Sequence, residues 1–66
     1  MLIKVNNRIE EFQGDTVQEL ITEKGLSQKS GMAVAVNDIV IPKTEWHNHR
    51  IKENDTIILI RPAHGG

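Results

Sequence analysis

The stretch Thr56-Ile57-Ile58-Leu59-Ile60-Arg61, near the end of the chain, decides the fold that the sequence predicts. Four consecutive apolar residues are typical of a strand that is buried on both faces, as the central strands of parallel sheets are. The chain also begins with a short apolar stretch, Leu2-Ile3-Lys4-Val5. We therefore expect a last strand at residues 56–61 that lies in the middle of a sheet, beside a first strand at residues 2–5.

Two pairs of residues, each between two predicted strands, predict tight hairpin turns. Asn6-Asn7 follows the first strand directly, and asparagine tolerates the positive backbone angles that a two-residue hairpin turn requires. Residues 8–12 are then the returning strand. Two more strands, at residues 32–36 and 39–41, flank a second turn of the same kind at Asn37-Asp38.

One helix is expected, over residues 16–24. Its start matches a capping box, Thr16-Val17-Gln18-Glu19, in which the threonine and glutamate side chains bond to exposed backbone amides. Apolar residues then recur at helical spacing, and Gly25 supplies a left-handed C-cap. A single helical turn at residues 44–46 and a turn at residues 53–55 complete the prediction.

The order is therefore β-β-α-β-(β)-β, an α+β arrangement. A central last strand beside a central first strand, with one main helix packed across a mixed sheet of four to five strands, is the β-grasp fold. Two packed layers around one core suit a chain of 66 residues. We expect one β-grasp domain at residues 1–61 and a flexible C-terminal Gly-Gly tail at residues 62–66.

One helix covers only one face of a sheet, which leaves a question about the last strand. Either loops and Trp46 cover the second face, or part of that face is an exposed apolar patch for a partner protein. The run of apolar residues does not show whether Ile58 and Ile60 or Ile57 and Leu59 point outward. Trp46 itself is expected to be a core anchor, with an exposed interface role as the alternative.

Composition excludes several classes of function. The chain has no cysteine, which favours a reducing cytoplasmic setting and removes thiol nucleophiles and thiolate metal sites. Net charge is -1 and the cationic residues are scattered, so no surface for a nucleic-acid backbone is indicated. No stretch approaches the roughly 20 apolar residues of a membrane span. We expect a soluble cytoplasmic protein without nucleic-acid or membrane partners.

No enzyme active site is evident among the polar residues. His47-Asn48-His49 offers two imidazoles without a clear third ligand, so no metal site is predicted and these residues are assigned to a solvated loop. His64 is interpreted as an exposed bystander, with tail orientation or proton transfer as the alternative. No glycine-rich phosphate loop is present, so any ATP must be bound by a partner.

The C-terminal tail, Pro62-Ala63-His64-Gly65-Gly66, is the candidate reactive segment. Pro62 ends the strand, and the four residues after it reach at most about 13 to 14 Å when extended. Gly65 and Gly66 have no Cβ, so they fit a narrow channel into the active site of another enzyme. The terminal carboxylate, with an ordinary pKa of roughly 3.3 to 3.7, is ionised at neutral pH. It can attack the α-phosphate of ATP, which gives an acyl adenylate. A sulfur nucleophile can then attack this adenylate and displace AMP.

The whole chain resembles the ubiquitin-like sulfur carrier proteins, and in detail the sulfur carriers of thiamine biosynthesis. The match runs from Met1 to Gly66, and the segment at residues 37–46 is its most specific part. The residues that carry it are Asn6, Thr16-Val17, Leu20, Ala33-Val34-Ala35-Val36-Asn37, Ile41-Pro42-Lys43, Trp46, Asp55 and Gly65-Gly66.

This resemblance implies a mechanism and a set of partners. In the family, an E1-like enzyme adenylates the terminal glycine carboxylate with ATP, and a sulfur donor protein converts the adenylate to a thiocarboxylate. The loaded carrier then gives its sulfur to thiazole synthase. Carried over by position, Gly66 holds the sulfur and Gly65 gives access. The protein is then a co-substrate without a bound cofactor, not an enzyme.

Two alternatives to this function remain open. The small subunit of molybdopterin synthase resembles the same fold and also ends in Gly-Gly, so molybdopterin or another sulfur acceptor is a possible client. A β-grasp binding module with an incidental tail is the other alternative. Asn7, Lys43 and His64 differ from the residues usual in the thiamine carriers, which leaves partner preference open.

Overall fold

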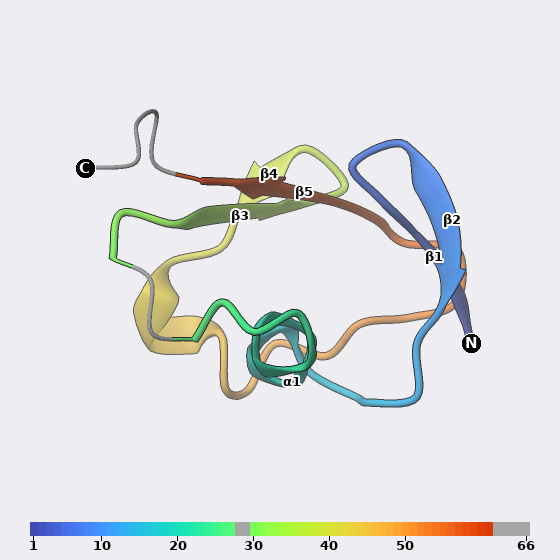
Figure 1. The fold of residues 1–66 in the computed structure, drawn as a ribbon, viewed down its shortest axis with the longest axis horizontal. Helices are drawn as coiled ribbons and strands as arrows, with labels where there is room; N and C mark the ends of the chain where they lie inside the picture. The colour runs from blue at the N-terminus through green and yellow to red at the C-terminus, as the bar shows by residue number, and fades with distance from the viewer. Residues whose placement is uncertain (28–29, 62–66) are drawn as a thin grey trace.

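The computed structural model describes residues 1–27 and 30–61. Every predicted strand and helical segment is present, with ends that differ by one residue at most, a normal margin for such boundaries. The elements in Figure 1 are β1 (Leu2–Val5), β2 (Arg8–Glu11), α1 (Val17–Glu23), β3 (Ala33–Val36), β4 (Ile39–Val40), the 3₁₀ helix η1 (Lys43–Glu45) and β5 (Thr56–Ile60). No helix in the described part of the chain is long and apolar enough to cross a membrane.

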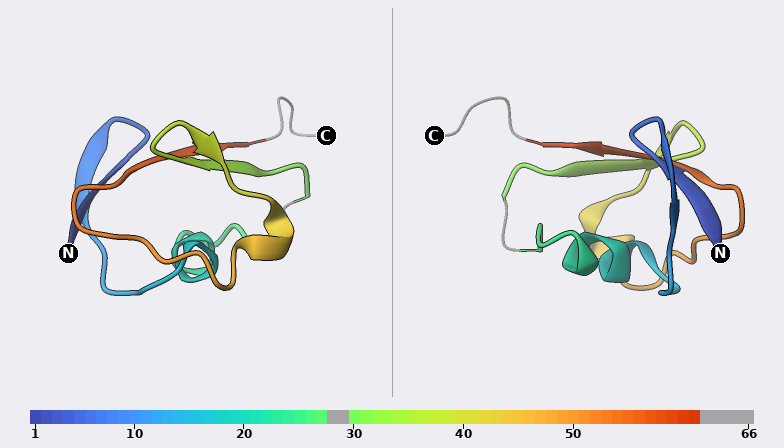
Figure 2. Two further views of the ribbon diagram at one scale, coloured as in Figure 1. Left: turned by 180° about the vertical axis from the view of Figure 1, so that it is seen from behind. Right: turned by 45° about the vertical axis from the view of Figure 1, so that its right-hand side comes forward.

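The five strands form one mixed sheet in the order β2-β1-β5-β3-β4. β5 pairs in parallel with β1 and antiparallel with β3, so the last strand lies in the middle of the sheet, as predicted. Figures 1 and 2 show α1 and the connection that follows β4 on the same side of this sheet. The α+β, β-grasp fold class is confirmed.

The core fills the space between the sheet and α1. Its buried side chains are Ile3, Val5, Phe12, Val17, Leu20, Ile21, Leu26, Val34, Val36, Ile41, Trp46, Ile51, Ile57 and Leu59. Phe12 follows β2 directly, and its ring packs against the backbone of Gly14. A Cβ added at Gly14 would lie 2.6 Å from Phe12 Cζ, so a residue without a side chain is needed there.

Both predicted hairpin turns have the expected backbone conformation. Asn6 and Asn7 have φ angles of 49° and 71°, and Asn37 and Asp38 have φ angles of 50° and 71°. Positive φ at both central residues defines the turn whose twist matches that of the flanking strands. Asparagine and aspartate adopt this region more readily than other residues with side chains, which explains why they stand at these four positions.

The predicted caps of α1 are also present. The Thr16 side chain accepts a hydrogen bond from the Glu19 amide at 3.3 Å, and Glu19 Oε1 accepts one from the Thr16 amide at 2.9 Å. At the other end, Gly25 has a φ of 74°, and the Leu26 amide donates to the Ile21 carbonyl at 3.0 Å. A seven-residue helix is short for independent stability, so these caps and its buried face together fix its position.

The capping glutamate should make stability sensitive to acid. Hydrogen bonds from the backbone amides of Thr16 and Asp15 hold the pKa of Glu19 below its ordinary value of 4.5. Since the folded state has the lower pKa, the ionised side chain adds stability that is present above about pH 4.5 and lost as the pH falls through the folded pKa. The urea concentration at the unfolding midpoint should fall as the pH drops below that value. We expect this fall to be smaller in Glu19→Gln than in the wild type. Glu23→Gln, which removes a charge from the same helix, is the control, and an unchanged acid profile in Glu19→Gln would contradict this role.

Candidate functional site

The predicted reactive residue, Gly66, lies outside the described residues, as do Gly65, Pro62 and His64. The division into a domain and a flexible tail therefore stays a prediction. The structure describes the strand that leads to this segment, as far as the exposed Arg61.

β5 is paired with β3 from Ile57 to its last residue. The register runs from Val36 opposite Ile57 to Ala33 opposite Ile60, the last residue of the strand. The backbone is therefore extended and hydrogen-bonded up to the residue before Arg61. The described part of the chain thus ends, at Arg61, directly after a central strand of the sheet.

On its other side, β5 extends past the end of β1, and Asn6 bonds to the part of β5 that β1 does not reach. β1 ends at Val5, which lies opposite Ile57. The Asn6 amide still donates to the Ile57 carbonyl at 3.0 Å. Its side chain then replaces the strand: Oδ1 accepts from the Leu59 amide at 2.8 Å, and Nδ2 donates to the Leu59 carbonyl at 3.3 Å.

A second asparagine acts at the start of the same strand. Asn37 Oδ1 accepts from the Thr56 amide at 3.0 Å, and its Nδ2 donates to Asp55 Oδ1 at 3.0 Å. Asp55 Oδ2 accepts in turn from the Lys52 amide at 2.8 Å. The sequence predicted both asparagines as turn residues and included them in the family resemblance, but their bonds to β5 were not predicted.

The faces of β5 settle the question that the apolar run left open. Ile57 and Leu59 point into the core, Ile58 is half-buried, and Ile60 is 51% exposed. The expectation of burial on both faces is therefore wrong. The reason is that α1 and the connection after β4 cover only one side of the sheet (Figure 2).

The uncovered side of the sheet, which we call the outer face, is largely apolar. Pairing places Lys4 beside Ile9, Ala35 beside both Ile58 and Val40, and Ala33 beside Ile60. Ile9 is 72% and Val40 67% exposed, and the two charged side chains of this set are Lys4 and Glu11, which lies opposite Leu2. The residues of the outer face are Leu2, Lys4, Ile9, Glu11, Ala33, Ala35, Val40, Thr56, Ile58 and Ile60.

Trp46 does not cover this face. It is buried in the core, where its Nε1 donates to the Ile41 carbonyl at 2.9 Å and its own carbonyl accepts from the Gln18 amide at 2.9 Å. The prediction that Trp46 is a core anchor is confirmed. Among the described residues, the interpretation in which Trp46 covers the second face is therefore wrong.

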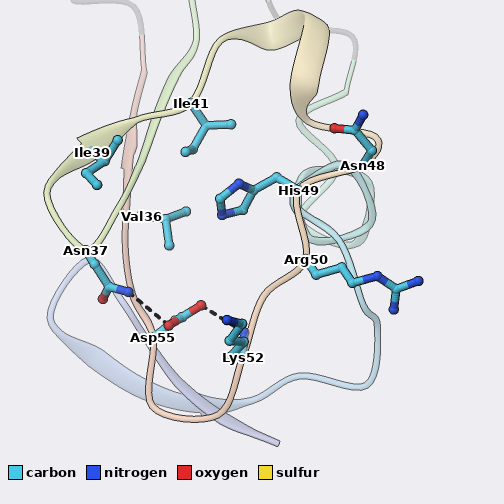
Figure 3. A pocket seen from close by; sticks show the side chains of 9 residues that line it. All are labelled: Val36, Asn37, Ile39, Ile41, Asn48, His49, Arg50, Lys52 and Asp55. Carbon is cyan, nitrogen blue, oxygen red and sulfur yellow. Dashed lines mark hydrogen bonds between the residues drawn. The ribbon is translucent and has the colours of Figure 1, made fainter.

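A groove of about 450 Å³ lies between the β3–β4 hairpin and residues 48–52 (Figure 3). The His49 ring points into it toward Val36, whereas Arg50 points away and pairs with Asp15 at 2.8 Å. His47 is exposed and does not line the groove. Within residues 1–27 and 30–61, no group of three histidine, cysteine, aspartate or glutamate side chains could hold a metal ion.

Comparison with known proteins identifies the family. A model of the ThiS family matches residues 3–66, which includes the C-terminal Gly-Gly. The chain belongs to the ThiS family. The ubiquitin-like sulfur carrier family expected from the sequence is thereby confirmed. A ThiS relative from Escherichia coli strain K12, named Sulfur carrier protein ThiS, is 34% identical over 53 residues, which are 80% of this chain and 79% of the relative.

Two solved ThiS structures from Geobacter metallireducens, both described as a thiamine biosynthesis protein, have the same fold. The crystal structure superposes with a TM-score of 0.83 and the solution structure with 0.80, each at 22% identity. All of this chain is covered, together with 100% and 88% of the two ThiS chains. At this identity the likeness shows the fold, and it confirms the ThiS β-grasp arrangement.

Substitution by threonine at two positions of β5 tests which side chains face the core. Ile57→Thr should cost about 2 to 4 kcal/mol, because it removes buried methyl groups and places a hydroxyl in the core. Ile60→Thr keeps a β-branched side chain on the exposed face and should change stability by about 0.5 kcal/mol or less. Urea unfolding measures both free energies, and equal losses would contradict the assignment of the faces.

Proposed function

We propose that this protein is a sulfur carrier of thiamine biosynthesis in which the terminal carboxylate of Gly66 is the reactive group. The observation that carries the proposal is the ThiS family match, which extends through residue 66. The Escherichia coli relative bears the name of a sulfur carrier, and the Geobacter structures are described as thiamine biosynthesis proteins. The position of β5 supports the same conclusion, because this central strand ends at Ile60, close in the sequence to Gly65-Gly66.

The proposed chemistry takes place on the terminal carbonyl carbon. A carboxylate oxygen of Gly66 attacks the α-phosphate of ATP and displaces pyrophosphate, which leaves an acyl adenylate. The terminal sulfur of a persulfide on the donor protein then attacks the carbonyl carbon and displaces AMP, which leaves an acyl disulfide. A thiol cleaves the S–S bond of this acyl disulfide, which releases the thiocarboxylate and leaves a disulfide on the donor. A chain without cysteine can carry sulfur in this way, since the sulfur is bonded to the main chain.

The partners supply the catalytic groups for these steps. An E1-like enzyme binds ATP and adenylates Gly66, and thiazole synthase accepts the sulfur. The protein is a co-substrate in both reactions. Residues 63–66 span at most about 13 to 14 Å when extended, which is enough to place the terminus in a recessed active site while the domain stays outside.

The outer face is the surface that suits these partners. It carries exposed apolar side chains from four strands, its two charges (Lys4 and Glu11) are confined to β1 and β2, and it extends to Ile60, the last residue of β5. Interface cores are depleted of charged residues in the same way. Since both enzymes need the same carboxylate and the same adjoining surface, they bind the carrier in turn.

Intact-mass measurement tests the reactive group directly. We expect incubation with ATP, an E1-like activating enzyme and a sulfur donor to replace one oxygen by sulfur, with the change mapped to Gly66. Deletion of Gly66, or addition of one alanine after it, should abolish loading, because the carboxylate is then displaced. Sulfur on the deleted chain, or an unloaded wild-type chain in a mixture that loads another ThiS protein, would contradict the proposal.

A charge on the outer face tests the docking surface. Ile60→Asp should lower kcat/KM for loading by at least about tenfold, because a carboxylate at the centre of an apolar contact must be desolvated. Ser27→Asp adds the same charge to an exposed loop and should leave loading unchanged. Loading reactions quenched at set times and analysed by mass spectrometry, at several carrier concentrations, give kcat/KM for both variants. Equal effects of the two variants would show that net charge alone matters.

A further inference from the structure

The exit of β5 from the sheet depends on Asn6. In a regular parallel ladder the Leu59 amide would bond to the next main-chain carbonyl of β1. The positive φ of Asn6 turns the chain into the hairpin instead. The side-chain amide takes over both bonds to Leu59, across a separation of 53 residues in the sequence.

Asparagine is the residue that meets both requirements of this position. Its backbone must adopt a φ of 49°, and its side chain must offer one acceptor and one donor at short reach. Glycine meets the first requirement and lacks the side chain. Aspartate accepts but does not donate when ionised. The pair of bonds to Leu59 is thus a specific function of the Asn6 amide, separate from its role in the turn.

We propose that Asn6 is a positioning residue for the loading of Gly66. Through Leu59 it fixes the backbone at the point where the chain leaves the sheet, on the side that β1 no longer covers. The inference rests on the proposed sulfur-carrier function. Asn6 does not touch the reacting atoms in this account, and it acts by ordering Leu59, Ile60 and Arg61 before a partner binds.

The expected consequence is a change in KM. Without the two bonds, the backbone at Leu59 loses its support on the β1 side, and the partner must order about one residue when it docks on Ile60. The cost of ordering that much backbone corresponds to about a five- to thirtyfold weaker encounter. Once the carrier is bound the same geometry is reached, so kcat should change by less than about twofold.

Asn37 provides a matched control for Asn6. It is also the first residue of a two-residue turn, its φ is 50°, and its side chain also bonds to β5. Its partner is Thr56, at the opposite end of the strand from Ile60, about 13 Å away along an extended chain. Asn6→Gly and Asn37→Gly therefore remove the same kind of contact from the two ends of one strand.

The experiment compares Asn6→Gly, Asn6→Asp and Asn37→Gly in full-length protein. Urea unfolding gives global stability, amide hydrogen exchange followed by NMR gives the local opening at Leu59, and the mass assay gives KM and kcat for loading. In Asn6→Gly we expect Leu59 exchange to rise by about tenfold or more beyond the change in global stability, and KM to rise by about fivefold or more. Asn37→Gly should lose similar stability with KM within about twofold of wild type.

Asn6→Asp should fall between wild type and Asn6→Gly. It keeps the acceptor for the Leu59 amide, which makes the shorter of the two bonds, but its second oxygen faces the Leu59 carbonyl. A KM for Asn6→Asp below that of Asn6→Gly would show that the effect depends on the hydrogen bonds to Leu59, because the turn conformation is open to all three residues. An intermediate KM in this variant would therefore support positioning.

Three outcomes would overturn the inference. If Asn6→Gly speeds exchange at Leu59 and leaves KM unchanged, Asn6 contributes to stability and does not position the tail. If Asn37→Gly raises KM as much as Asn6→Gly, the effect comes from weakening β5 as a whole. A wild-type chain that is never loaded overturns the proposed function together with positioning, whereas a loaded wild type beside an unaffected Asn6→Gly overturns positioning alone.

Discussion

The parallel pairing of β1 with β5 is the constraint on which the rest of the structure depends. It joins residues near the two ends of the chain, with Lys4 opposite Thr56 and Val5 opposite Ile57. A strand between β1 and β3 cannot lie at an edge, so the last strand is central and is paired with a neighbour on both sides. The connections obey the same constraint, because α1 must cross between two hairpins that flank one shared strand.

Small size then determines the character of the sheet's second side. One seven-residue helix and the connection after β4 supply enough apolar surface to cover one face. The other face remains uncovered by the described residues, with Ile9, Val40 and Ile60 exposed. In an ordinary small domain such a surface would be a liability. Under the proposed function, it is the surface on which the partner enzymes dock.

Asparagine serves two purposes in this fold. Asn6 and Asn37 adopt the positive φ angles of the hairpin turns, and their side chains bond to the two ends of β5. The turns that end β1 and β3 are thus coupled to the strand that carries the tail. The same two residues therefore form the turns with their backbone and support β5 with their side chains. Substitutions are needed to separate these two roles.

The sequence by itself determined the order of strands and helix, the caps of α1, both hairpin turns, the central place of β5 and the family, because these depend on local spacing and residue type. Gly66 as the reactive residue stays a prediction that rests on the sequence and the family. The tertiary structure decided which side of β5 faces the core, since Ile57 to Ile60 are all apolar and lack the alternation that reveals a face. It also decided that Asn6 bonds to Leu59 and Asn37 to Thr56. A hydrogen bond between residues so far apart along the chain leaves no local pattern, and only the paired strands bring its atoms together.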